Sequence, residues 1–202
     1  RLVAETGRIG GCERQGRQSH AGEDADQFAG GGEHRPLVTQ GIQMIRHGQE
    51  NVAIADRLHR WTRALMLTAS AADLPATLTR ELMHQFMIPQ SGIRLWGAAE
   101  AFAALPFATP VSADVKSLAA SLTLPYCGVN SGFEAAQWLD DPASAMSIAM
   151  IPLRHGAGIG AFGMLVLASP DPTRYTAEMG TEFLQRIGEL ASAALSRLLP
   201  VS

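Results

Sequence analysis

The residues from Met146 to Leu199 constrain the fold of this 202-residue chain more than any other segment. Two apolar runs, 146–153 and 159–168, flank a glycine-rich turn, and a Ser-Pro-Asp-Pro turn then leads into a long amphipathic stretch. Apolar runs of this length on either side of a glycine turn predict the two antiparallel strands of a hairpin. The segment therefore predicts a hairpin followed by a closing helix.

The same turn matches the Gly-x-Gly-x-x-Gly fingerprint of dinucleotide-binding proteins at Gly158, Gly160 and Gly163. That fingerprint binds a pyrophosphate only where a helix starts directly after the glycines. Here Met-Leu-Val-Leu-Ala follows Gly163 and predicts a strand, which Pro170 ends. We therefore interpret these glycines as a hairpin turn and not as a nucleotide site.

A long helix is predicted over residues 42–70, where apolar side chains recur at steps of four, three and four. At about 1.5 Å per residue this helix is on the order of 40 Å long, which exceeds what a small sheet needs for cover. We therefore expect its apolar stripe to serve both the core and the seam of a homodimer. The stripe consists of Ile54, Leu58, Trp61 and Leu65.

Shorter elements are predicted between this helix and the hairpin. Asp73 is placed to cap a second helix over residues 74–86, and the run 87–96 predicts a strand. Ser112 is placed to cap a short helix, whereas the composition of residues 126–132 predicts a loop.

Two further residues mark the hairpin and the helix that follows it. Pro152 lies inside the first hairpin strand, which predicts either an edge strand or a bulge there. Thr176 is placed to cap the closing helix.

Motifs in the second half of the chain resemble one bacterial family. They are Cys127-Gly128, Ser147 through Leu153, Gly163-x-Leu165, Ser169-x-Asp171-Pro-x-Arg-Tyr175 and Thr176-x-x-Met179-Gly180-Thr-x-Phe183-Leu184. In these the chain resembles the family catalogued as domain of unknown function 484, whose members are GAF-like. The resemblance implies an α+β fold, with a central antiparallel sheet flanked by long N- and C-terminal helices and a lid of short helices and loops. It brings no established activity.

Two regions follow from composition and from this resemblance. Residues 1–41 are rich in glycine and charge and contain few large apolar residues. Such a segment cannot bury enough apolar surface to offset the entropy lost when a chain becomes ordered. We expect them to be a disordered or misassigned tail. Residues 42–199 are expected to form a single GAF-like domain that begins with the long helix.

Charge and cysteine content argue against several classes of protein. A formal net charge of −3 and an isoelectric point near 6.1 lack the basic footprint of a nucleic-acid-binding protein. No apolar run reaches the roughly 18–20 residues that span a bilayer. Two isolated cysteines give neither a disulfide framework nor a metal set. We therefore expect a cytoplasmic protein that binds neither nucleic acid nor membrane.

Candidate ligand residues come from the first strand and from the region that lids a GAF pocket. Arg94 alternates with Ile93, so it faces either the cup between sheet and lid, where it can hold an anion, or solvent. Tyr126 and Trp138 belong to the lid region in the resemblance. The full candidate set is Arg94, Trp96, Tyr126, Cys127, Trp138, Ser147 and Ser169.

The expected function is that of a non-enzymatic sensory or binding domain with no catalytic residues, no metal and no predicted cofactor. It acts through a small molecule, through helix-mediated association with a second copy or another protein in trans, or through both. Two alternatives stay open: a small thiol-dependent enzyme that uses Cys127, and a ligand-free adaptor whose cup is filled by side chains.

Overall fold

The computed structural model describes residues 34–156, 160–177 and 181–200, and the environment of side chains from residue 51 onward. Gly158 of the hairpin turn and Met179 lie outside the described residues. The chain divides into two compact units, residues 1–45 and residues 46–202. The first is described only as the beginning of helix α1, and the second contains the sheet.

A four-stranded antiparallel sheet lies at the centre of the second unit, in the order β1-β4-β3-β2. Its strands are β1 (Gln90–Leu95), β2 (Tyr126–Val129), β3 (Ser147–Arg154) and β4 (Ala161–Ser169). β3 and β4 pair as antiparallel neighbours from Ser147–Ser169 to Arg154–Ala161. The predicted hairpin is thus confirmed, and a strand, not a phosphate-binding helix, follows Gly163.

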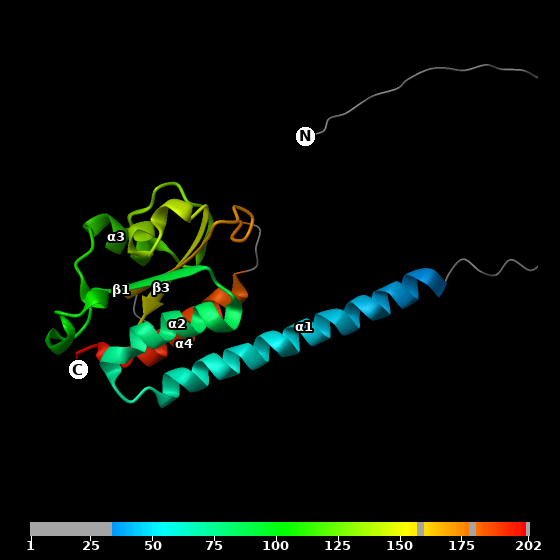
Figure 1. Ribbon diagram of the computed structural model, residues 1–202, viewed down its shortest axis with the longest axis horizontal. Coiled ribbons are helices and arrows are strands. Elements are labelled where there is room, and N and C mark those ends of the chain that lie inside the picture. The colour runs from blue at the N-terminus through cyan, green and yellow to red at the C-terminus, as the bar shows by residue number, and fades with distance from the viewer. Residues whose placement is uncertain (1–33, 157–159, 178–180, 201–202) are drawn as a thin grey trace, which may run out of the picture. The chain divides into compact units, whose positions relative to one another are not determined.

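Helices cover both faces of this sheet. Helices α2 (Leu74–Phe86) and α4 (Glu182–Leu195) lie side by side on one face, where the Phe86 and Phe183 rings are 5.0 Å apart (Figure 1). Helix α3 (Ala113–Ser121) and a 3-10 helix, Glu134–Trp138, cover the other face as a lid. The architecture is the α+β arrangement that the sequence predicts.

The two central strands are buried on both faces. Leu165 and Leu167 of β4 pack in the core on the helix side, whereas Met164 and Val166 pack in the core under the lid. All four are fully buried. Because successive side chains of a strand point to opposite faces, a strand covered twice needs apolar residues at every position. This burial explains the uninterrupted apolar run in the sequence.

Helix α1 (His34–Leu67) meets the rest of the second unit through its last three turns. Trp61 is fully buried, and its indole Nε1–H donates a hydrogen bond of 3.2 Å to the carbonyl oxygen of Leu78 in α2. Leu65 is also buried, and Leu58 is partly buried against the same core. Ile54, one turn further back on the predicted stripe, is 42% exposed.

Several boundaries differ from the sequence prediction. Helix α1 begins at His34 and ends at Leu67, not at 42 and 70. β1 begins only at Gln90 because Met87 ends α2 in the left-handed region, with φ of 50°. The Ser112 cap is confirmed: its side chain accepts a hydrogen bond from the N–H of Val115.

Two predictions about local structure are wrong. Tyr126–Val129 is not a loop but the edge strand β2, which pairs with the first half of β3. Thr176 does not cap the closing helix, because α4 starts at Glu182 with Thr181 at the cap position. Asp73 occupies the cap position of α2, but its carboxylate makes no capping hydrogen bond.

Pro152 satisfies both halves of its prediction. β2 pairs with Ser147–Met150, so Pro152 lies where no strand of the described residues neighbours β3 on that side. The register between β3 and β4 also shifts between Leu153 and Arg154. Proline has no backbone N–H to donate. It is accommodated there because no described strand on that side accepts a hydrogen bond from this position.

Replacing Trp61 by alanine tests the docking of α1. We expect Trp61→Ala to lower the free energy of unfolding by about 3–5 kcal/mol, because a large buried side chain and its hydrogen bond are lost. Met66→Ala on the same helix, where the side chain is 79% exposed, should stay within about 0.5 kcal/mol of the parent. Urea unfolding measures both, and equal effects would contradict the described packing.

Replacing Gly188 by alanine tests how closely α4 lies on the sheet. A Cβ at Gly188 would come within 2.7 Å of Ile151 Cγ2, so we expect Gly188→Ala to destabilise the protein by about 1–3 kcal/mol. Gly160 is the matched control, because a Cβ there would meet no atom of the described residues within 4 Å. Thermal unfolding that ranks Gly160→Ala as the more damaging change would show that the α4–β3 contact is looser than described.

Candidate functional site

The space between the lid and the sheet is filled by side chains. Ile148, Met150, Met164 and Val166 are fully buried on this face of the sheet. They pack in one cluster with residues of α3 and of the 3-10 helix Glu134–Trp138. In the part of the chain that the structure describes, the expected cup is therefore an apolar core.

A cavity of about 280 Å³ lies instead at the outer edge of β1. β1 lies at one end of the sheet, so one of its edges has no partner strand among the residues that the structure describes. The cavity is bounded by α2, by the 3-10 helix Pro106–Ala108 and by the end of the lid. Its lining includes Pro75, Thr79, Ser91, Arg94, Phe107 and Trp138.

Arg94 and Trp138 meet at this cavity, although 44 residues separate them in the chain. The Arg94 Cζ atom lies 5.8 Å from the centroid of the Trp138 ring, a cation–π contact. Gly92 makes this approach feasible, because a Cβ there would lie 2.9 Å from the Trp138 carbonyl oxygen. The glycine thus allows the lid to lie directly against β1.

The Arg94 guanidinium is half-buried and carries no carboxylate partner within the described residues. Its Nη1 donates a hydrogen bond of 3.0 Å to the carbonyl oxygen of Ile93. Burial lowers the pKa of Arg94 from its usual value because desolvation disfavours the charged form. Such an uncompensated cation attracts an anionic or hydrogen-bond-accepting group.

Trp96 and Tyr126, the other aromatic candidates, lie under the lid but line neither of the two cavities described here. The Trp96 indole Nε1–H donates a hydrogen bond of 2.7 Å to the carbonyl oxygen of Ala161. The Tyr126 ring packs edge-to-face on Phe133 with centroids 5.3 Å apart. Both side chains therefore serve the packing of the lid.

Cys127 lies on the opposite face of the sheet from the lid, in the core beneath the helices. Burial raises the pKa of the Cys127 thiol, which keeps it protonated and weakens it as a nucleophile. It lines neither cavity. Cys12, the only other cysteine of the chain, lies outside the described residues.

Ser147 and Ser169 pair across the ends of β3 and β4, away from both cavities. The Ser147 hydroxyl donates a hydrogen bond of 2.6 Å to the carbonyl oxygen of Asp171, and Ser169 Oγ accepts one from the Asp171 N–H. Asp171 Oδ1 in turn accepts hydrogen bonds from the N–H and hydroxyl of Thr173, which lower the pKa of Asp171. Both serines therefore fix the turn after β4.

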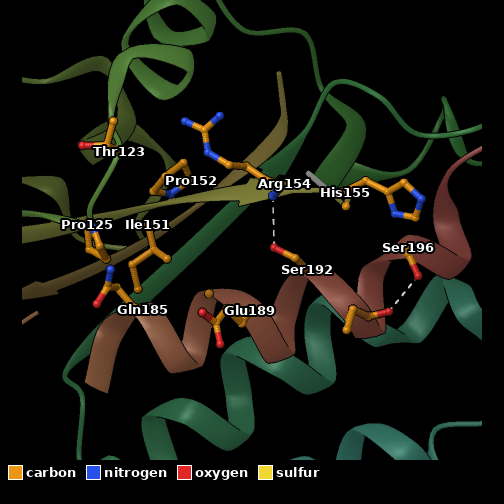
Figure 2. A pocket seen from close by; sticks show the side chains of 13 residues that line it. Thr123, Pro125, Ile151, Pro152, Arg154, His155, Gln185, Glu189, Ser192 and Ser196 are labelled. Atoms are coloured by element: carbon orange, nitrogen blue, oxygen red, sulfur yellow. Dashed lines mark hydrogen bonds between the residues drawn. The ribbon is translucent and has the colours of Figure 1, made fainter. Parts of the chain in front are cut away.

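A second cavity, of about 600 Å³, lies between α4 and the open half of β3. Figure 2 shows Ile151 and Pro152 on the strand, with Gln185, Glu189 and Ser192 on the helix. The sequence analysis proposed none of its lining residues. Pro152, as a mark of an open strand edge, is the signal that could have pointed there.

Arg154 connects this groove to the lid. Its backbone N–H donates a hydrogen bond of 3.1 Å to Ser192 Oγ, whereas its side chain rises away from α4 (Figure 2). The guanidinium Nη2 donates to the carbonyl oxygens of Ala119, Ala120 and Leu122 at the end of α3. The Arg154 guanidinium therefore binds the end of α3 in the lid.

Neither a cluster of metal-ligating side chains nor a membrane-spanning helix is found among the described residues. Across residues 34–156, 160–177 and 181–200, His, Cys, Asp and Glu side chains do not gather in threes as metal ligands require. None of the described helices combines the length and apolar character that a membrane crossing requires.

Comparisons with solved structures identify the fold. The GAF domain from an Acinetobacter phosphoenolpyruvate-protein phosphotransferase is 14% identical, with a TM-score of 0.52, over 71% of this chain and 92% of that chain. The corresponding GAF domain from Coxiella burnetii is 11% identical, with a TM-score of 0.51, over 72% and 94%. The GAF domain of a sensor histidine kinase from Pseudomonas syringae pv. tomato gives 19% identity and a TM-score of 0.49, over 76% and 92%. The first two similarities show a GAF fold alone.

The sequence comparisons identify the family. A search of curated proteins finds no match. A family model described as protein of unknown function, DUF484, matches residues 33–199, which begins nine residues before the domain expected over 42–199. The chain therefore belongs to the DUF484 family and carries a GAF-like domain.

Proposed function

We propose that this domain is a non-enzymatic binding module that takes a small molecule into the cavity at the outer edge of β1. The observation that carries the proposal is the meeting of Arg94 and Trp138 at that cavity. One comes from the edge strand and the other from the lid, so a ligand there contacts two elements at once. Bound ligand can then favour one arrangement of the lid over another, as a sensor requires.

The environment of Cys127 weighs against the alternative of a thiol-dependent enzyme. The thiol is buried, its pKa is raised, and it lines neither cavity. In the larger groove, the Ser192 hydroxyl accepts the Arg154 N–H. The Ser196 hydroxyl donates to the carbonyl oxygen of Ala193. These local contacts support a binding role over nucleophilic chemistry.

The adaptor alternative draws support from the packed core under the lid. A filled cup leaves no room for a ligand in the place where it was expected. The adaptor and the binding module make different predictions for the cavity at the edge of β1. A binding module takes up a ligand there, and an adaptor does not.

We also propose that the protein is cytoplasmic and acts as a homodimer, and helix α1 supports the homodimer. The stripe that carries Trp61 and Leu65 into the core continues to Ile54, which no part of the second unit covers fully. A second copy of this helix would cover Ile54 by a coiled-coil-like seam. Association through α1 then offers a way to pass the binding state to a partner in trans.

Closing the β1-edge cavity tests the binding proposal. Ala76 on α2 lines that cavity and is exposed, so Ala76→Trp fills it from the surface with little effect on the fold. We expect a panel of nucleotides, amino acids and small organic acids to contain compounds that raise the melting temperature of the parent protein. We expect Ala76→Trp to remove those shifts.

Ala193→Trp is the matched control, because Ala193 is an exposed helical alanine that lines the α4–β3 groove. It should leave the shifts intact. Loss of binding in Ala193→Trp alone would place the ligand in the groove. A panel and native mass spectrometry that both find no ligand would favour the adaptor.

Charge placed on the α1 stripe tests the dimer. We expect the parent protein to scatter light as a dimer at tens of micromolar, and Ile54→Asp to be monomeric because a carboxylate would be buried in the seam. Val52→Asp is the control, since Val52 is 70% exposed and lies on another face of the helix. A monomeric parent, or equal effects of both changes, would contradict the proposed seam.

A further inference from the structure

We infer that the cavity at the outer edge of β1 selects a small organic anion, with its acidic group at Arg94 and a flat apolar body against Trp138. This inference rests on the proposed function and adds the chemical class of the ligand. Three features of the cavity carry it: its charge, its hydrogen-bond donors and its walls.

The charge of the cavity comes from one residue. Among the described residues, its lining contains Arg94 and no other charged side chain. The guanidinium is held towards the cavity wall by its hydrogen bond to Ile93 and by the Trp138 ring, and it forms no ion pair within the described residues. A planar guanidinium matches a carboxylate or phosphate through paired N–H···O bonds, so an acidic ligand group supplies the missing counter-charge.

The free edge of β1 adds hydrogen-bond donors. The backbone N–H of Trp96 donates a hydrogen bond to the carbonyl oxygen of Phe162 in the β1–β4 ladder. This bond fixes which residues of β1 direct their backbone N–H groups towards β4. Ser91 and Ile93 are therefore the residues whose backbone N–H groups point away from β4, towards the open edge. The Ser91 hydroxyl is also buried and finds no hydrogen-bond partner among the residues that the structure describes. A ligand oxygen near Ser91 would satisfy a group that is otherwise costly to bury.

The walls of the cavity set the size and shape of the rest of the ligand. Pro75, Leu105, Phe107 and Trp138 present apolar surface. At about 30 Å³ per water-sized unit, the volume of about 280 Å³ holds on the order of nine non-hydrogen atoms. Such a space fits a single ring or a short branched chain bearing one acidic group. A tetrapyrrole or a dinucleotide is too large.

Four small aromatic probes separate the effect of charge from that of fit. Benzoate, benzamide and benzamidine share a ring and the same number of non-hydrogen atoms but are anionic, neutral and cationic, and phenyl phosphate replaces the carboxylate by a phosphate. We expect calorimetric titration of the full chain to show at least one of the two anions binding about tenfold or more tighter than benzamide. We expect no binding of benzamidine. The tighter anion identifies the acidic group that the site prefers.

Variants of Arg94 test whether the preference comes from this residue. We expect Arg94→Met to lose the roughly tenfold preference for the anion, and Arg94→Lys to keep part of it, because lysine retains charge but not the planar fork. Arg80→Met is the matched control, since Arg80 is an exposed arginine of α2 that does not line the cavity. Melting curves establish that each variant is folded. If Arg94→Met does not fold, the partial loss of the preference in Arg94→Lys is the test.

Failure of this inference is distinguishable from failure of the proposed function. An anion preference that survives Arg94→Met overturns the placement of the acidic group at Arg94. Equal binding of benzoate, phenyl phosphate and benzamide overturns the anion class. Ala76→Trp would then still block the neutral probe, so the binding module stands. Absence of binding by all four probes also overturns the inference, while the broader panel decides the function separately.

Discussion

The rest of the structure depends on the burial of β3 and β4 on both faces. Leu165 and Leu167 join the core beneath α2 and α4, and Met164 and Val166 join the core beneath the lid. Two layers of helix therefore pack against one hairpin. The same burial leaves the cavities at the borders of the sheet, because its centre has no unfilled space under the lid.

Much of the fold could be predicted because its determinants are local. The hairpin, helix α2 and the Ser112 cap each follow from residues a few positions apart. β2 could not be predicted in this way, since Tyr126–Val129 is a strand only by pairing with β3. The start of α4 was misplaced for a similar reason: Thr176 has the chemistry of a cap, but the helix begins at Glu182.

The meeting of Arg94 and Trp138 at the candidate site could not be predicted from the sequence, although both residues were candidates. Alternation along β1 identified Arg94 as a residue that could face the lid, and the lid region supplied Trp138. Their contact depends on Gly92, because the absence of a Cβ there leaves room for the Trp138 backbone. No local sequence pattern predicts a contact between residues so far apart in the chain. The sequence also could not show that the expected cup is packed, because cavity volume depends on how distant side chains fit together.

The open half of β3 has a consequence for how the molecule behaves in a crowded solution. An unpaired strand border is a template on which a foreign chain can add, and so a route to aggregation. Pro152 has no N–H to offer, and the Arg154 N–H is already taken by the Ser192 hydroxyl. An incoming strand would therefore find neither donor at these two positions. This border therefore discourages templated growth of the sheet.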